Sequence, residues 1–264
     1  MRTHWIDRDG LRLHAQEDGS PTGPALIFAN SLATDLTLWD GVVAHLSENL
    51  RILRYDMRGH GRSDVPDPPY TMGALIADAE AICDALNVRD AVMVGLSVGG
   101  MVAQGLAIKR LDLLRGMVLS NTAAKIGTPA IWQDRIDALE AGGMAALTDA
   151  ILDRWFGPRN TDTPLARAWR EKLLAVDPKG YAGVSAAISG TDFYTPTSGL
   201  RLPTLGIAGA NDGATPPDLV RETVDLIPGS RFELMRRCGH LPCIEDPEGY
   251  ARILTTFLTD IGHI

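Results

Sequence analysis

The stretch Ala91-Val92-Met93-Val94-Gly95-Leu96-Ser97-Val98-Gly99-Gly100 decides the fold that the rest of the chain must support. A short apolar run leads into Gly-x-Ser-x-Gly, and an apolar pattern with helical spacing follows at once. This order predicts a strand, a sharp turn carrying Ser97, and a helix whose first N–H groups point toward whatever the serine attacks. Such a turn strains the serine backbone, and side chains at 95 and 99 would collide with the neighbouring strand and helix.

The same stretch could also be a chance match or a membrane span. Roughly 0.1 matches to Gly-x-Ser-x-Gly are expected by chance in a chain of this composition, so the motif alone only suggests a nucleophile. Residues 91–108 are also 18 uncharged positions, which is close to the length of a membrane span. The pair Gly99-Gly100, together with Ser97 and Gln104, favours a strand and a buried helix over a membrane span.

The composition is typical of a soluble globular protein. Of the 264 residues, 45% are hydrophobic and 22% are charged, which allows one large domain or a core with an insertion. The net charge of −8 and the lack of a basic tract argue against nucleic acid as a partner. The first ten residues carry charges and no apolar segment, so we expect no secretory signal and a cytoplasmic location.

The cysteines indicate neither a disulfide framework nor a metal site. There are three of them, an odd number. Two flank a histidine in Cys238-Gly239-His240-Leu241-Pro242-Cys243, but only three candidate ligands lie there and no second ligand pair exists elsewhere in the sequence. A zinc site is therefore disfavoured, and no metal is expected.

Strands alternate with helices in the first half of the chain. Asp9-Gly10 joins two alternating segments, residues 3–8 and 11–17, and predicts a hairpin. Further elements are expected as strands at 25–30, 51–56, 91–96 and 117–120, and as helices at 39–50, 71–86 and directly after Ser97. This alternation predicts an α/β fold, with a mostly parallel sheet, helices on both faces and right-handed crossovers.

The alternation stops between about Thr122 and Gly199, where no strand is predicted. Helical segments are expected there at 130–140, 144–156, 165–176 and 181–188. The alternation then resumes with a strand at 204–209, a helix at 216–227, a strand at 231–235 and a helix at 247–259. The sequence thus predicts a core formed by residues 1–122 and 200–264, with residues 123–199 inserted as a helical cap.

A serine nucleophile needs a base within hydrogen-bond reach, and the base needs a third group to orient it. In a parallel sheet the loops that follow the strands gather at one edge, where ligands bind. His240 follows the last predicted strand and is the best candidate base. The remaining histidines fall on the hairpin, on an early helix, on a loop before the turn that carries Ser97, or at the end of the chain. They are His4, His14, His45, His60 and His263.

Asp212 is the candidate acid, because it follows the strand that ends at Gly209. The competing position, after the strand at 117–120, holds Asn121 and no carboxylate. The order Ser, Asp, His along the chain is the order described for a serine elbow on an α/β sheet. Two backbone N–H groups should stabilise the developing oxyanion: Val98, directly after the serine, and Leu32, in the loop after the strand at 25–30.

Several motifs resemble those of a known family. Asp56–Asp64 matches the Asp-x-Arg-Gly-x-Gly-x-Ser-Asp loop of the α/β-hydrolase superfamily. More narrowly, the chain resembles 3-oxoadipate enol-lactonases in Phe28–Leu32, Ser120–Gly127, Asp212–Pro217 and Gly239–Cys243, which span nearly its full length. The narrower family often has glycine where this chain has Ala33, and the methyl group could shift the oxyanion loop slightly.

The resemblance implies a reaction. Ser97, activated by His240, would open a small anionic enol-lactone, and water would release 3-oxoadipate from an acyl-enzyme, without metal or cofactor. The substrate carboxylate requires a cation near the pocket. Trp132 and Arg135 lie at i and i+3 of a predicted cap helix, hence on one face, and are the candidates for lining the pocket and pairing the carboxylate. The alternate cations are Arg154, Arg58 and Lys125.

Several functions remain open on the sequence alone. A different lactonase or esterase, or a cofactor-free perhydrolase, would use the same triad, whereas a ligand-binding receptor of this fold would not need turnover. Haloalkane dehalogenases and epoxide hydrolases are disfavoured, because they place aspartate where this chain has Ser97.

Overall fold

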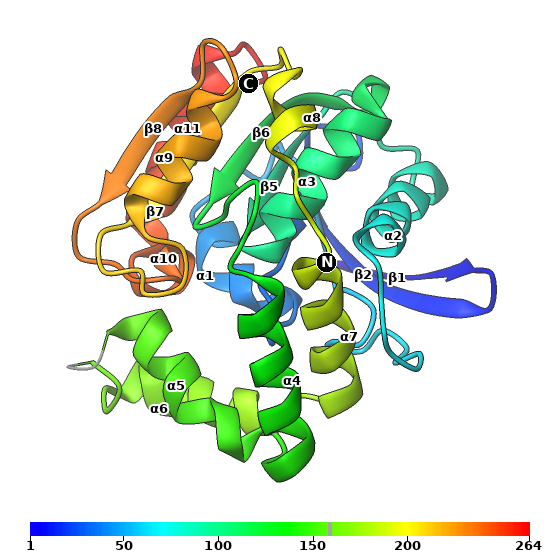
Figure 1. The fold of residues 1–264 in the computed structure, drawn as a ribbon. Coiled ribbons are helices and arrows are strands. Elements are labelled where there is room, and N and C mark those ends of the chain that lie inside the picture. The colour runs from blue at the N-terminus through cyan, green and yellow to red at the C-terminus, as the bar shows by residue number, and fades with distance from the viewer. Residues whose placement is uncertain (158–159) are drawn as a thin grey trace.

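The computed structural model describes residues 1–157 and 160–264, and its centre is a single eight-stranded sheet. The strand order is β1-β2-β4-β3-β5-β6-β7-β8 (Figure 1). The strands are β1 (Arg2–Arg8), β2 (Leu11–Gly19), β3 (Ala25–Ala29), β4 (Arg51–Tyr55), β5 (Ala91–Leu96), β6 (Leu114–Ser120), β7 (Thr204–Gly209) and β8 (Arg231–Met235). All neighbours from β4 to β8 pair in parallel, and only β1–β2 and β2–β4 are antiparallel. The predicted fold class and the hairpin at Asp9-Gly10 are confirmed.

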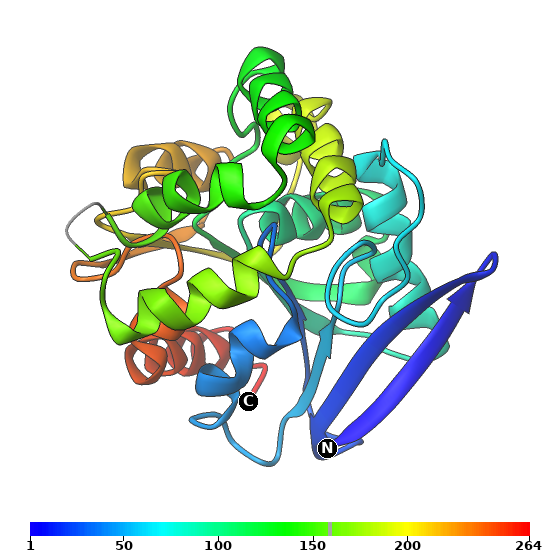
Figure 2. The ribbon, with the colours of Figure 1, turned by 90° about the horizontal axis from the view of Figure 1, so that it is seen from below.

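Helices cover both faces of the sheet, as Figures 1 and 2 show. On one face α2 (Met72–Ala85) packs against α3 (Val98–Lys109). On the opposite face the short α1 (Asp40–Val43) packs against α11 (Pro247–Asp260). Two further helices follow β7 and β8, namely α9 (Pro217–Asp225) and α10 (Pro242–Glu245).

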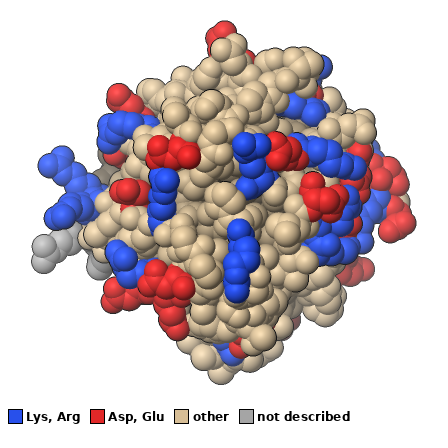
Figure 3. Space-filling model, turned by 90° about the horizontal axis from the view of Figure 1, so that it is seen from above, with Lys and Arg blue, Asp and Glu red and all other residues tan. Residues whose placement is uncertain are grey.

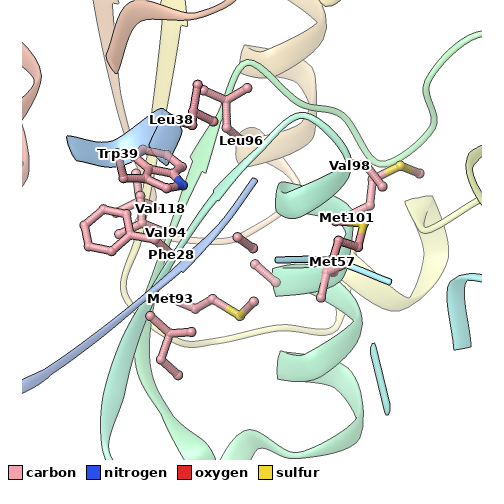
Figure 4. Packing of buried hydrophobic residues seen from close by; sticks show 14 of the residues in the cluster. Phe28, Leu38, Trp39, Met57, Met93, Val94, Leu96, Val98, Met101 and Val118 are labelled. Carbon is pink, nitrogen blue, oxygen red and sulfur yellow. The ribbon is translucent and has the colours of Figure 1, made fainter. Parts of the chain in front are cut away.

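The apolar run 91–108 forms β5 and α3, at the centre of the core. Every residue of β5 is buried, and α3 is buried from Val98 to Ala107. Figure 4 shows Val94 and Leu96 of this strand packed near Phe28 and Trp39. Within residues 1–157 and 160–264, no helix is both long and apolar enough to span a membrane. The strand-and-helix interpretation is therefore correct.

The predicted helix at 39–50 is wrong over most of its length. A short 3₁₀ turn, Leu36–Trp39, leads into α1, which ends at Val43. The chain then continues through turns, in which Leu50 N–H donates to Ser47 O and Asn49 N–H donates to Ser47 Oγ. Serine and asparagine compete in this way with helical hydrogen bonds, which explains the early end of the helix.

The segment between β6 and β7 is helical, as predicted. It contains α4 (Pro129–Gly142), α5 (Ala145–Phe156), α6 (Pro164–Leu174), α7 (Pro178–Ser189) and a short α8 (Tyr194–Ser198) that the sequence did not predict. Helices α4 to α7 lie across the carboxyl ends of the parallel strands (Figures 1 and 2). The division into a core and a cap at residues 122 and 200 stays a prediction.

Replacing Gly99 by alanine should destabilise the fold, because a Cβ there would lie 2.2 Å from the Ala29 carbonyl oxygen. Relieving that contact requires backbone movement, and overpacking of this kind costs about 1–3 kcal/mol or more. Gly73 is a matched control, because it is also the second residue of a helix but a Cβ there would meet nothing closer than 3.8 Å.

Urea denaturation measures both effects. We expect a lower free energy of unfolding for Gly99→Ala, and an unchanged or slightly higher one, by up to about 1 kcal/mol, for Gly73→Ala. Equal changes in the two variants would contradict the close approach of α3 to β3.

Candidate active site

Ser97 sits on the turn between β5 and α3 in a strained conformation. Its backbone has φ 57° and ψ −119°, a left-handed φ that non-glycine residues rarely adopt. The turn is held from both sides, because Ser97 N–H donates to Ser120 O over 2.9 Å and Thr122 Oγ1 donates to Ser97 O over 2.6 Å. A Cβ on Gly95 would lie 2.2 Å from the Gly99 carbonyl oxygen, so the turn also requires glycine at 95. The predicted sharp turn is confirmed.

Asp212 and His240 meet at the carboxyl ends of β7 and β8. His240 Nδ1 lies 2.8 Å from Asp212 Oδ2, and both side chains are buried. The Oδ1 atom of Asp212 accepts the N–H groups of Ala214 and Thr215, over 2.7 and 3.0 Å. An acid held in this way fixes the tautomer of the histidine, so that Nε2 is left to act as a base.

Two more side chains donate to Asp212 Oδ2, the oxygen that faces His240, and neither was predicted from the sequence. Asn121 Nδ2 lies 2.8 Å from Asp212 Oδ2 and 3.1 Å from Gly239 O, and Thr215 Oγ1 lies 2.7 Å from Oδ2. Burial acts to raise the pKa of Asp212, but the charge of His240 and these hydrogen bonds outweigh it, so the pKa lies below its usual value. The carboxylate form is thereby favoured. Asn121 occupies the position after β6 where the sequence offers no carboxylate, and its amide supports the acid from there.

The end of α5 supports both catalytic loops through its main chain. His240 N–H donates to Trp155 O over 2.7 Å, and Gly213 N–H donates to Arg154 O over 3.0 Å. A Cβ on Gly239 would lie 2.0 Å from the Trp155 carbonyl oxygen, so only glycine allows this approach. The last carbonyls of a helix have no partner inside the helix, and here they accept from the loops after β7 and β8.

The loop after β3 runs beside the serine turn. Asn30 anchors it, with Nδ2 donating to Tyr55 O and Oδ1 accepting from Trp39 Nε1, each over 2.8 Å. Ala33 adopts φ 65°, the left-handed region that favours glycine. The alanine thus stands at a position whose backbone suits the glycine expected from the resemblance.

One cavity brings most of the predicted site residues together. It has a volume of about 50 Å³, so little bulk water surrounds its walls. The predicted residues that line it are Ser97, His240, Leu32, Trp132 and Arg135. Asp212 lies behind His240, and Val98 is the buried first residue of α3. Residues that were not predicted for the pocket wall also line it, among them Tyr181, Trp155 and Ile151.

Two arginines face this cavity, and the sequence favoured one of them. Arg135 comes from α4, where its guanidinium carbon lies 4.4 Å from the centre of the Trp132 ring. Arg154 comes from α5 and lines the same cavity. Neither forms an ion pair with a carboxylate of the described residues. Burial, together with the charge of Arg135, lowers the pKa of Arg154.

The remaining two cations considered from the sequence point elsewhere. Arg58 forms two hydrogen bonds to Asp78, over 2.5 and 2.7 Å, and Lys125 pairs with Asp192 over 3.1 Å. On the face of the molecule opposite α4 to α7, basic and acidic side chains likewise lie next to one another (Figure 3). The two cavity arginines differ from these paired cations.

Glu245 is a further carboxyl group close to the base. Its Oε1 accepts Gly239 N–H over 2.7 Å, one residue before His240. Burial raises the pKa of Glu245 to about 7; the hydrogen bond from Gly239 acts in the opposite direction and the charge of Asp212 adds to the increase. No sequence pattern singles this residue out, because its burial follows from the packing of α10.

Comparison with known proteins places this arrangement in a family. The family described as alpha/beta hydrolase fold matches residues 24–247. The chain therefore belongs to the α/β-hydrolase family.

Within that family the most informative similarities are to enol-lactonases. The chain is 34% identical to 3-oxoadipate enol-lactonase 1 of Acinetobacter baylyi, over 97% of this chain and 96% of that protein. The crystal structure of an enol-lactonase from Burkholderia xenovorans LB400 superposes with a TM-score of 0.92 at 35% identity, covering 97% of this chain and all of that chain. A thermophilic esterase from Thermogutta terrifontis gives a TM-score of 0.90 at 25% identity, over 99% of both chains. The resemblance drawn from the motifs is confirmed.

The free energy of unfolding should fall as the pH rises because Glu245 ionises, and replacing Glu245 by glutamine should abolish this decrease. The carboxyl group has a pKa of about 7 in the folded protein and about 4.3 when unfolded. Folding therefore takes up a proton between these values, and stability falls as the pH rises through this window. Glutamine keeps an oxygen acceptor for Gly239 N–H but cannot ionise.

Urea denaturation at pH 5 and pH 8 tests this expectation. At pH 8 Glu245→Gln should be more stable than the unsubstituted protein by about 1 kcal/mol, a figure reduced to allow for water around the partly exposed carboxyl. The difference should shrink toward pH 5. Glu248→Gln, an exposed substitution in the next helix, is the control; a pH-independent difference for Glu245→Gln would show that its charge is not the cause.

Proposed function

We propose that this protein is a serine hydrolase that opens 3-oxoadipate enol-lactone to 3-oxoadipate. The observation that carries the proposal is the single small cavity that joins Ser97 and His240 to two arginines without a carboxylate partner among the described residues. The family and the enol-lactonase relatives support hydrolysis of this kind of substrate. The choice of 3-oxoadipate enol-lactone as the substrate rests on the chemistry of the residues that line this cavity.

The first half of the reaction forms an acyl-enzyme. Ser97 Oγ attacks the lactone carbonyl carbon while His240 Nε2 takes its proton, and Asp212 stabilises the resulting imidazolium. The bond from the carbonyl carbon to the ring oxygen then breaks. The ring oxygen leaves with the proton from His240 as an enol, which tautomerises to a ketone and makes ring opening effectively irreversible.

The oxyanion of each tetrahedral intermediate is stabilised by the N–H groups of Leu32 and Val98. Val98 is the first residue of α3, so its N–H has no acceptor inside the helix. Leu32 lies in the loop after β3 and lines the same cavity as the serine. Donors of this kind each contribute about 2.7–4 kcal/mol to the stabilisation of the transition state.

The second half of the reaction uses water. His240 takes a proton from the water, whose oxygen attacks the acyl carbon, and Ser97 leaves with that proton. The product is 3-oxoadipate with a new carboxylate. No step in this scheme requires a group other than the side chains and N–H groups already named.

Arg135 and Arg154 bind the carboxylate that the substrate carries beside its ring. Two guanidinium groups held near each other in a small cavity repel, and burial further disfavours their charged forms, as the lowered pKa of Arg154 indicates. A carboxylate between them offsets both costs and forms charge-assisted hydrogen bonds. Tyr181, in the same wall, adds a hydroxyl group beside them.

Replacing Ser97 by alanine should abolish turnover. With p-nitrophenyl acetate, the unsubstituted protein should release a burst of about one equivalent of p-nitrophenol, because an acyl-enzyme accumulates. Ser97→Ala should show no burst and a rate lower by about 10⁵- to 10⁶-fold. Ser47→Ala, an exposed serine on a turn, is the control. A protein that binds the lactone but turns over no ester would be a receptor and would refute the enzymatic proposal.

Replacing either arginine by glutamine should impair the anionic lactone selectively. We expect kcat/KM for 3-oxoadipate enol-lactone to fall about 10- to 100-fold for Arg135→Gln and for Arg154→Gln, the value of a charged hydrogen bond of about 1.5–3 kcal/mol. With α-angelica lactone, an enol-lactone that has a methyl group in place of the carboxymethyl arm, the change should be under about threefold.

This pair of substrates separates the possible outcomes. Equal losses on both lactones would mean that the arginines support the structure and do not bind the carboxylate. Efficient hydrolysis of α-angelica lactone with no turnover of 3-oxoadipate enol-lactone would keep the hydrolase and exclude this substrate. Arg170→Gln, on an arginine that pairs with Asp149 outside the cavity, is the matched control.

A further inference from the structure

The loop between β4 and α2 carries a buried histidine that the proposed reaction does not use. His60 is only 5% exposed, and its Nε2 accepts Ala33 N–H over 3.0 Å. Its Nδ1 lies 3.3 Å from the carbonyl oxygen of Arg58, which can only accept a hydrogen bond. The two partners therefore assign the ring proton to Nδ1 and leave Nε2 as an unprotonated acceptor.

The hydrogen-bonded N–H belongs to the central peptide of a tight turn. Thr34 N–H and Thr34 Oγ1 both donate to Ser31 O, over 3.3 and 2.8 Å, and close the turn Ser31–Thr34. Ala33, the third residue, has φ 65°, whereas Leu32, the second, does not have a positive φ. This pattern defines a type II turn, in which the third position favours glycine.

Alanine makes this turn the less stable of two alternatives. A type I turn would give Ala33 a relaxed negative φ, and it differs from the type II turn by a flip of the Leu32–Ala33 peptide. A left-handed alanine costs about 1–2 kcal/mol. An acceptor placed for the N–H of the flipped peptide offsets that cost, and His60 is the acceptor that the structure provides.

We propose that His60 is a positioning residue of the oxyanion loop, where its Nε2 holds Ala33 in the left-handed turn and thereby fixes the orientation of the Leu32–Ala33 peptide, next to the Leu32 N–H that serves as a donor. This inference rests on the proposed function, in which that N–H binds the oxyanion. Because a trans peptide is planar, fixing Ser31 O through Thr34 fixes the Leu32 N–H in the opposite direction. A flip of the next peptide would leave that direction in place, but it would reverse the dipole of the Leu32–Ala33 peptide beside the oxyanion donor.

The surroundings of His60 keep it fixed and neutral. Asp56 accepts Arg62 N–H over 2.9 Å and Leu36 N–H over 2.8 Å, and so ties the histidine loop to the chain that follows the oxyanion turn. Burial lowers the pKa of His60, although the Arg58 carbonyl and the carboxylates of Asp56, Asp35 and Asp177 act in the opposite direction. The ring also borders a second cavity of about 340 Å³, which shares Ala33 with the catalytic cavity.

A double-mutant cycle between residues 60 and 33 tests the proposal. His60→Ala should lower kcat for p-nitrophenyl acetate about 10- to 100-fold with little change in KM, because a reversed peptide dipole beside the oxyanion affects the transition state. In the Ala33→Gly background the same substitution should lower kcat less than threefold, because glycine adopts the left-handed turn without assistance. His60→Gln, whose amide oxygen can accept the Ala33 N–H, should stay within about fivefold of the unsubstituted protein.

A merely structural role of His60 predicts different results. Equal losses from His60→Ala in both backgrounds would overturn the proposal, and so would a His60→Gln variant as impaired as His60→Ala. Thermal unfolding shows whether each variant folds. If His60→Ala does not fold, His60→Gln is compared in the Ala33 and Ala33→Gly backgrounds. The proposal then requires that any loss of kcat caused by His60→Gln is smaller with glycine at position 33.

Nitrogen NMR of histidine-labelled protein gives a readout that does not depend on activity. At pH 7 the His60 resonances should show the Nδ1-protonated neutral ring. An Nε2-protonated or positively charged ring would overturn the proposal, even if Ser97→Ala abolishes turnover. The converse outcome is that His60 shows the expected tautomer and the expected coupling to residue 33 while Ser97→Ala retains turnover. That outcome would leave the role of His60 in the turn intact and would refute the proposed hydrolytic role of Ser97.

Discussion

The site depends on two backbone hydrogen bonds at the end of α5. Trp155 O accepts from His240 N–H and Arg154 O accepts from Gly213 N–H, so the last turn of one helix holds the loops that carry the base and the acid. These carbonyls would otherwise lack partners, because helix ends leave their final acceptors unsatisfied. Gly239 makes the contact possible, since any side chain there would overlap the Trp155 carbonyl. The inserted helices are therefore part of the support for the candidate triad, in addition to forming the wall of the cavity.

The same helix end joins the proposed carboxylate site to the candidate catalytic groups. The main chain of Arg154 is bonded to the acid loop, while its side chain lines the cavity beside Arg135. A change in the position of α5 would thus alter both the proposed carboxylate site and the placement of His240. Asn121 adds a second link, because its amide group bridges Asp212 and the carbonyl of Gly239. Asp212, His240 and Arg154 are consequently held in one hydrogen-bonded frame that spans the ends of β6, β7 and β8.

Much of this arrangement could be predicted from the sequence, and the parts that could not share a physical cause. The elbow and the buried strands have local signatures, namely glycines at close approaches and continuous apolar runs, and the acid and base follow strands in the expected chain order. Bonds to main-chain carbonyls, such as those to Trp155 O, have no signature because every residue has a carbonyl. The second arginine remained an alternate because periodicity shows which residues share a face of one helix, whereas Arg154 meets Arg135 only through the packing of two helices. The prediction of a helix at 39–50 was wrong for a local reason, because the chain forms a competing turn at Ser47.

Two left-handed residues that are not glycine, Ser97 and Ala33, line the same cavity. Each conformation is unfavourable by about 1–2 kcal/mol and persists only where the surrounding structure enforces it. Around Ser97 the enforcing contacts are hydrogen bonds to Ser120 and from Thr122, and around Ala33 the contact is the acceptor nitrogen of His60. In the proposed reaction, these two strained turns carry the backbone N–H groups of residues 32 and 98 that would stabilise the developing negative charge, and the buried hydrogen bonds offset the cost of the strain.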